Sequence, residues 1–140
     1  MSKFCYSMYI YQDSLGGENV TLYDSELKVM EVLWQNGDMK ATEICKILEN
    51  TIGWKRSTSY TVVKKCIDKG YIQRIEPHFV CKAILSKQEA CQNSISEVKQ
   101  KFFSNSSLDL VKTMLHAQEL SKEDIAELYA IVENEMRTKN

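Results

Sequence analysis

The sequence lacks a long apolar run and closely spaced cysteines. No run approaches the roughly 20 apolar residues needed to span a bilayer, and the start of the chain lacks the apolar segment of a secretory signal. The five cysteines are odd in number and scattered, without a C-x-C or C-x-x-C pair, which argues against a disulfide framework and a zinc site. These absences predict a cytoplasmic protein in a reducing compartment, without a metal, a cofactor or membrane contact.

The sequence also lacks recognisable catalytic motifs. It contains no H-E-x-x-H, no G-x-S-x-G and no phosphate-binding glycine loop. The sequence has two histidines. His78 falls in an expected turn, and His116 falls near the C-terminus of an expected helix, where the helix dipole favours a cation. Cys45, Cys66 and Cys91 fall on or beside apolar helix faces and are interpreted as small core residues. We therefore expect the chain not to be an enzyme.

Charge is nearly balanced over the whole chain, with a formal net charge of −1, but it is unevenly distributed. Residues 51–82 contain seven basic residues against two acidic ones, and the rest of the chain is acidic. A basic island in an acidic chain is typical of a nucleic-acid-binding face, with an ordinary solvated helix face as the alternative. The seven basic residues are Lys55, Arg56, Lys64, Lys65, Lys69, Arg74 and Lys82.

The spacing of apolar residues predicts three helices, over 24–36, 41–50 and 55–69, followed by a hairpin of strands 71–75 and 79–84. Asp24 is the expected N-cap of the first helix, with Leu27, Met30, Leu33 and Trp34 inward, and Gly70 is expected to end the third helix. A strand at 38–40 is expected to pair with the hairpin. Three helices followed by a hairpin is the order of a winged helix-turn-helix.

The last third of the chain is predicted to be helical over 87–103, 107–117 and 122–136. Ser86 with Glu89 and Ser121 with Asp124 form expected capping boxes, and Ser106 is expected to cap the middle helix. The apolar faces of these helices are too large to bury within so short a segment, so we expect them to require a partner surface. The residues expected to meet that partner are Phe102, Leu108, Val111, Met114, Leu115, Ile125, Leu128, Tyr129 and Val132.

The expected fold is therefore mainly α with a small antiparallel sheet. We expect an N-terminal extension of unassigned role over 1–21, a winged helix-turn-helix over 22–86 and a helical dimerisation domain over 87–140.

The predicted helix 55–69 has two chemically different sides. Its inward side is expected to carry Ser59, Val62, Val63, Cys66 and Ile67, whereas hydroxyls, one aromatic ring and cations occupy the outward side. The second helix of a helix-turn-helix enters the major groove, which admits an α-helix and presents a readable pattern of base edges. The residues expected to contact DNA are Arg56, Ser57, Thr58, Tyr60, Thr61, Lys64 and Lys65 on this helix and Arg74, His78 and Lys82 on the hairpin.

Four stretches between about residues 22 and 133 resemble the penicillinase-repressor (BlaI/MecI/CopY) family. They are DSELKVMEVLW at 24–34, ATEICKIL at 41–48, WKRSTSYTVVKKCIDKG at 54–70 and LSKEDIAEL at 120–128. The resemblance implies a bacterial homodimeric repressor on a palindromic operator, controlling a beta-lactam resistance or metal-homeostasis operon and inactivated by a signalling protease. It also implies that Thr58 and Thr61 are the recognition-helix threonines and that Lys65 is the basic residue near the helix end.

The sequence departs from this family at several positions. Lys55 and Arg56 replace a common Ser-Pro helix start, Lys40 replaces a Thr cap, and the hairpin is about two residues shorter than the usual wing. The Asn-Phe bond at which the antibiotic-sensing branch is cleaved has no counterpart, nor have the C-x-C pairs of the copper-sensing branch. The inducing signal therefore stays open. Two other functions also stay open: a winged-helix protein-interaction module, and a thiol-responsive regulator acting through Cys66 or Cys81.

Overall fold

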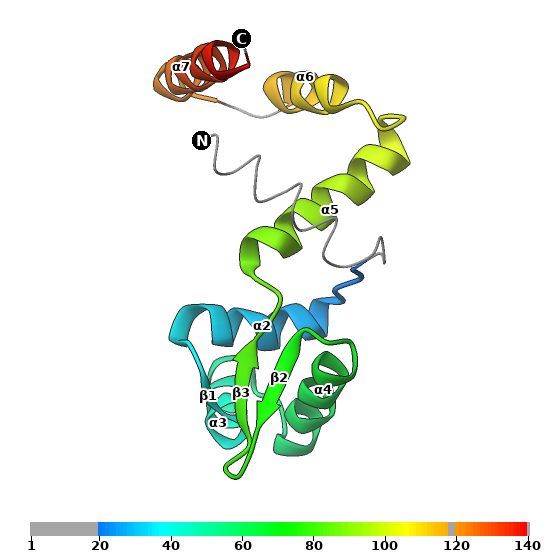
Figure 1. The fold of residues 1–140 in the computed structure, drawn as a ribbon, viewed down its shortest axis with the longest axis vertical. Helices are drawn as coiled ribbons and strands as arrows, with labels where there is room; N and C mark the ends of the chain where they lie inside the picture. The colour runs from blue at the N-terminus through cyan, green and yellow to red at the C-terminus, as the bar shows by residue number, and fades with distance from the viewer. Residues whose placement is uncertain (1–19, 118–119, 140) are drawn as a thin grey trace. The chain divides into compact units, whose positions relative to one another are not determined.

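A computed structural model of the chain describes residues 20–117 and 120–139 (Figure 1). The described residues fall into two compact units, 20–91 and the part of 92–139 that the structure describes. Among the described residues, no helix is both long enough and apolar enough to cross a membrane.

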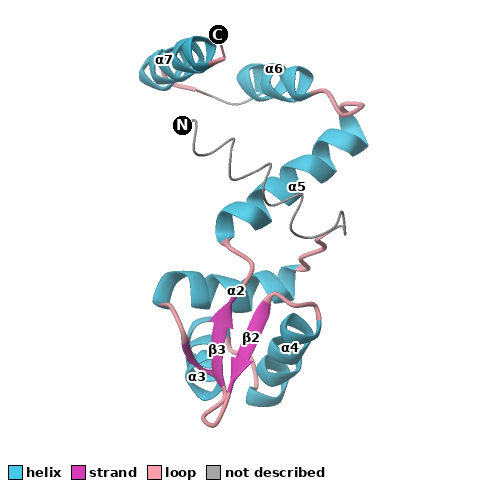
Figure 2. Cartoon of the chain, viewed as in Figure 1, coloured by secondary structure: helices cyan, strands magenta, loops and turns pink. Residues whose placement is uncertain are grey.

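The unit 20–91 contains three helices and a three-stranded antiparallel sheet (Figure 2). The strand order is β1-β3-β2, so the short strand after the first helix pairs with the second strand of the hairpin, as expected. This arrangement confirms the predicted fold, a winged helix-turn-helix that is mainly α. Its elements are α2 (Asp24–Asn36), β1 (Met39–Lys40), α3 (Ala41–Ile52), α4 (Arg56–Asp68), β2 (Ile72–Ile75) and β3 (Val80–Ala83).

The core of this unit is built from one side of each helix and from the sheet. Met30, Ile44, Val63 and Cys81 are fully buried and come from α2, α3, α4 and β3 respectively. Such burial of apolar side chains is the main favourable term in folding. The core therefore joins the three helices to the sheet and fixes which side of each helix faces outward.

The predicted core face of α2 was partly wrong. Met30 and Leu33 are buried as expected, but Leu27 and Trp34 are only half-buried. The fully buried positions also include Val29 and, unexpectedly for a charged residue, Glu26. The Trp34 ring lies at the edge of the core, where its Nε1 donates a hydrogen bond of 2.9 Å to the Leu85 carbonyl.

The ends of the helices also differ in part from the prediction. Asp24 is the first residue of α2 rather than its N-cap; Tyr23 is the cap, and its backbone N–H donates to Glu26 Oε1 at 3.0 Å. A glutamate at this third helical position satisfies a backbone N–H that the helix itself leaves unpaired. Helix α3 continues to Ile52, two residues beyond its expected end. Gly70 follows α4 with a φ of +81°, which confirms its predicted role.

The second unit contains helices that begin where the sequence predicts. The Ser121 side chain accepts from the Asp124 backbone N–H at 3.0 Å, and the Ser121 backbone N–H donates to the Asp124 carboxylate at 3.4 Å, so the capping box is confirmed. The expectation that Cys91 is a core residue was wrong, because its side chain is exposed. The helices of the C-terminal part of the chain are α5 (Lys87–Phe102), α6 (Ser107–Ala117) and α7 (Lys122–Thr138).

Candidate nucleic-acid interface

Helix α4 has a buried side and an exposed side, as the sequence predicts. Ser59, Val62, Val63 and Cys66 are buried against the rest of the unit, and Ile67 is half-buried. Because these residues hold α4 against the core, the helix cannot rotate about its axis, and its opposite side always faces outward. The exposed residues on this helix are Arg56, Ser57, Thr58, Thr61, Lys64, Lys65 and, at its last position, Asp68.

The hydroxyls on the exposed side of α4 are not equivalent. Thr61 Oγ1 donates a hydrogen bond of 2.9 Å to the Ser57 carbonyl one turn earlier in the helix. This use of the hydroxyl proton within the helix is common for threonine. The Thr61 hydroxyl oxygen is therefore available to a binding partner only as an acceptor. The exposed hydroxyls of Ser57 and Thr58 can rotate to donate or to accept.

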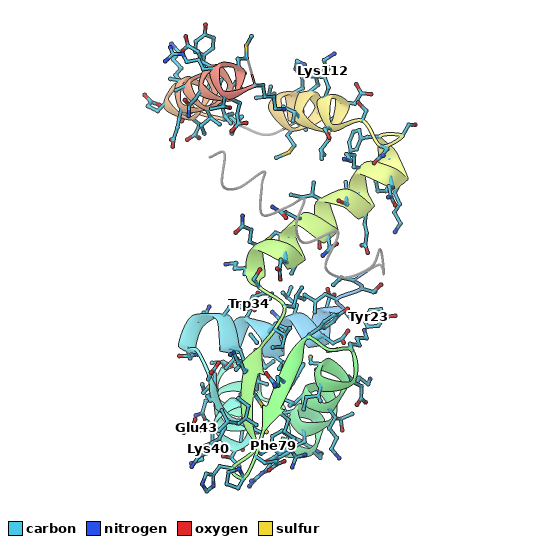
Figure 3. The ribbon with its side chains drawn as sticks, in the orientation of Figure 1. Tyr23, Trp34, Lys40, Glu43, Phe79 and Lys112 are labelled. Carbon is cyan, nitrogen blue, oxygen red and sulfur yellow. The ribbon has the colours of Figure 1, made fainter. Side chains whose placement is uncertain are left out.

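A stack of four side chains joins α4 to the hairpin; we refer to Arg56, Tyr60, Phe79 and Arg74 as the wing stack. The Arg56 guanidinium lies 5.6 Å from the Tyr60 ring centre, and the Tyr60 and Phe79 rings are 6.1 Å apart at an angle of 59°. The Arg74 guanidinium lies 3.6 Å from the Phe79 ring centre. Figure 3 shows Phe79 at the hairpin end of the sheet. The sequence reasoning included the other three residues in the interface but missed Phe79.

The predicted hairpin contacts lie on different faces of the sheet. Arg74 pairs with Cys81 across β2 and β3, and Gln73 pairs with Lys82. Successive side chains of a strand point to opposite faces, so Arg74 and Lys82 point to opposite sides. His78 is exposed in the turn between the strands. Among the predicted hairpin residues, the structure thus brings Arg74 to α4 through Phe79.

Arg74 also has an anionic neighbour within the hairpin. Its Nε forms an ion pair with the Glu76 carboxylate, and both side chains are largely exposed. An exposed pair of this kind adds little stability. Its consequence is electrostatic, since Glu76 offsets part of the positive charge of Arg74.

One basic residue of the island, Lys69, is held by contacts within the protein itself. Its Nζ donates to Glu26 Oε1 at 2.7 Å and to the Thr21 carbonyl at 3.2 Å, and it lies 4.1 Å from the Tyr23 ring centre. Burial lowers the pKa of Lys69, but the hydrogen bond and negative charge of Glu26 outweigh it, and the pKa is raised overall. We call the Lys69–Glu26 pair the Lys69 clamp. It connects the end of α4 to the start of α2.

The buried thiols are unsuited to redox chemistry. Burial raises the pKa of Cys66 to about 12 and that of Cys81 to about 11, so both are protonated at neutral pH. The thiolate is the reactive form of cysteine. This argues against a thiol-responsive regulator acting through either residue. In the part of the chain that the structure describes, no group of His, Cys, Asp and Glu is placed to hold a metal ion.

Comparison with known proteins gives this interface a context. Residues 22–134 match the family described as penicillinase repressor. The chain belongs to this family. A penicillinase repressor from Bacillus licheniformis is 27% identical over 118 residues, which cover 83% of this chain and 92% of the relative. Membership of the family confirms the resemblance stated above and makes the chain a DNA-binding transcriptional repressor rather than an enzyme.

Two solved structures are also similar to the chain. One is the solution structure of the DNA-binding domain of the repressor BlaI, which is 26% identical and matches with a TM-score of 0.47 over 51% of this chain and 90% of that one. The other is a MarR family protein from Bacillus stearothermophilus, 18% identical with a TM-score of 0.44 over 99% of this chain and 91% of that one.

Proposed function

We propose that the chain binds a palindromic operator as a homodimer and so blocks transcription, with α4 of each protomer in the major groove. The observation that carries the proposal is the two-sidedness of α4, in which Val62 and Val63 are locked into the core while Thr58, Thr61 and Lys64 are exposed. A helix held by its apolar side can present its polar side to base edges without losing its place in the fold.

The exposed groups divide by the part of DNA that they suit. Ser57, Thr58 and Thr61 can bond to base edges or phosphates, whereas Lys64 and Lys65 can neutralise phosphates. We therefore assign sequence discrimination to the hydroxyls and most of the salt-dependent affinity to the lysines.

The second protomer is proposed to cover the apolar faces of α6 and α7. None of the side chains of these two helices is buried in the described chain, and Leu108 and Tyr129 are 63% and 72% exposed. On each helix the exposed apolar residues recur three and four positions apart and so share one side. A contiguous apolar face of this kind marks an interaction surface. Two-fold symmetry of the dimer would match the symmetry of a palindrome.

DNA binding is tested by selecting duplexes from a random pool with the whole protein and titrating them by fluorescence anisotropy. If a dimer neutralises about 8 phosphates, log K falls with log salt at a slope near about −7. Lys64→Ala is expected to flatten this slope, whereas Lys28→Ala on α2, outside the proposed interface, is expected to leave it unchanged. A slope near zero for every duplex contradicts the proposal and favours the protein-interaction alternative.

Sequence reading by the hydroxyls is tested separately. Thr61→Ala is expected to weaken binding to the selected duplex more than binding to a random duplex, because base contacts carry the discrimination. Lys64→Ala is expected to weaken both by a similar factor. If both variants reduce the two affinities equally, the base contacts have been assigned to the wrong residue.

The dimer is tested with a matched pair of substitutions on α6. Met114→Asp places a carboxylate in the proposed apolar interface and is expected to yield monomers, because burying an unpaired charge is costly. Thr113→Asp introduces the same carboxylate at an exposed position on the opposite side of this helix and is expected to leave the dimer intact. Light scattering at low concentration measures the mass. A Met114→Asp protein with the mass of the wild type contradicts the assignment.

A further inference from the structure

We propose that Phe79 is a positioning residue for DNA binding, which holds the hairpin wing at a fixed distance from the recognition helix α4. The inference rests on the proposed function, because it assigns a role within the same interface. Phe79 itself is half-buried, and no direct contact with DNA is assigned to it. It acts through Tyr60 and Arg74, the two residues that its ring contacts.

The contacts of the Phe79 ring connect two elements that are separate in sequence. The centre of the ring lies 6.1 Å from that of Tyr60 on α4, and the Arg74 guanidinium of β2 lies over the ring at 3.6 Å from its centre. Tyr60 in turn lies beneath Arg56 at the start of α4. The wing stack therefore has a cation at each end, one on the helix and one on the wing, and the two rings between them set their spacing.

The backbone of Phe79 is in an unfavourable conformation for its side chain. Its φ is +51°, in the left-handed region that glycine and asparagine adopt readily and that bulky residues rarely occupy. Its carbonyl accepts a hydrogen bond of 3.0 Å from the backbone N–H of Ala41, the first residue of α3. A glycine could keep this backbone path without steric cost. What phenylalanine adds at this position is the ring, and with it the stack.

A fixed spacing of the two guanidinium groups matters for binding in register. Phosphate contacts set the position and orientation of a protein on the duplex, and base contacts form only when that position is correct. If Arg56 and Arg74 are already held before binding, less conformational freedom is lost when they meet phosphates. Removal of the ring would leave both cations on the protein but free their relative position.

The test compares Phe79→Gly with Phe79→Tyr in the full-length protein. The probes are a duplex selected from a random pool by the wild-type protein and a random-sequence duplex. Phe79→Gly relieves the left-handed strain, so we expect a urea midpoint no lower than that of the wild type, together with about a tenfold loss of affinity for the selected duplex. We expect a smaller loss on the random duplex. Phe79→Tyr keeps the ring and is expected to bind as the wild type does.

The outcomes separate a positioning role from a structural one. A merely structural residue would lose stability and affinity together, and a loss of affinity that vanishes after correction for the folded fraction overturns the proposal. Wild-type affinity of Phe79→Gly for the selected duplex overturns it too, while leaving the proposed function standing. If the wild-type protein itself shows no salt-dependent binding to either duplex, both proposals fail.

Discussion

Replacement of Lys69 by methionine tests the Lys69 clamp most directly. Glu26 is fully buried; its Oε1 accepts from Lys69 Nζ and from the Tyr23 backbone N–H, and its Oε2 has no hydrogen-bond partner among the described residues. Lys69→Met keeps most of the aliphatic side chain and removes the only positive charge bonded to this carboxylate in the described part of the chain.

The magnitude follows from the burial of the two partners. Removing one member of a buried ion pair typically costs about 3–5 kcal/mol, because the remaining charge is left uncompensated. The Lys69 side chain is 32% exposed, so water can reach this side of Glu26 and screen part of the cost. We therefore expect Lys69→Met to lower the free energy of unfolding by about 2–3 kcal/mol. That is a large share of the about 4–10 kcal/mol typical of a unit of this size.

Urea unfolding at neutral pH, followed by tryptophan fluorescence, measures the loss. Both tryptophans, Trp34 and Trp54, lie in the unit 20–91, so the signal reports this unit. Lys65→Met, at an exposed lysine in the last turn of α4, is the control and is expected to change stability by no more than about 0.5 kcal/mol.

A second substitution isolates the buried charge as the cause. Adding Glu26→Gln to Lys69→Met removes the unpaired charge and is expected to restore much of the lost stability. If Lys69→Met costs no more than Lys65→Met, or if the double variant is no more stable than Lys69→Met, the reasoning is refuted.

Three further predictions concern the hairpin and the thiols. Glu76→Gln removes the anion beside Arg74 and is expected to strengthen binding to random duplex and to steepen the slope of log K against log salt by about 1, measured by anisotropy; an unchanged slope contradicts it. The pKa of Cys66 is raised to about 12 and that of Cys81 to about 11. The contribution of these two protonated thiols to stability is therefore fully present at any pH below about 8.5, the pKa of a thiol in the unfolded chain. Above that pH the unfolded chain releases protons that the folded chain keeps, so urea midpoints should fall with rising pH, and less steeply in a Cys66→Ala/Cys81→Ala variant. Maleimide should modify the exposed Cys91 in the native protein but Cys66 and Cys81 only after unfolding, as measured by peptide mass spectrometry. Labelling of Cys66 in the native protein would contradict the burial of this thiol.

Helix positions and ends were largely predictable from the sequence. The capping boxes at Ser86 and Ser121 were confirmed, and so was the stop at Gly70, because each depends on residues within one helical turn. The N-cap of α2 was assigned wrongly to Asp24, because aspartate is a preferred capping residue and tyrosine is not. The observed cap is Tyr23. The Tyr23 backbone N–H donates to Glu26, the third residue of the helix. This bond fixed the start of the helix despite the preference of Asp24 for the capping position.

The candidate interface was predictable only as far as helical periodicity reaches. The buried and exposed sides of α4 follow from the 3.6-residue repeat, and therefore the exposed positions of Thr58, Thr61 and Lys64 could be named in advance. The inward face of α2 could not be predicted in the same way, because its apolar residues are numerous enough to define more than one face. The choice of Val29 over Leu27 for full burial was made by the elements packed against it.

The amino-acid sequence by itself determined the order of the elements, their boundaries to within about two residues and the two-sided character of α4, because these depend on interactions between near neighbours in the chain. Only the tertiary structure decided that Lys69 is bound to Glu26, 43 positions away, and that the Phe79 ring contacts both Tyr60 and Arg74. Such pairs carry no periodic signal, since their members meet only when packing of the core brings separate elements together. The local pattern thus decides which side of α4 is exposed, and the packed fold decides which cations are held by contacts within the protein.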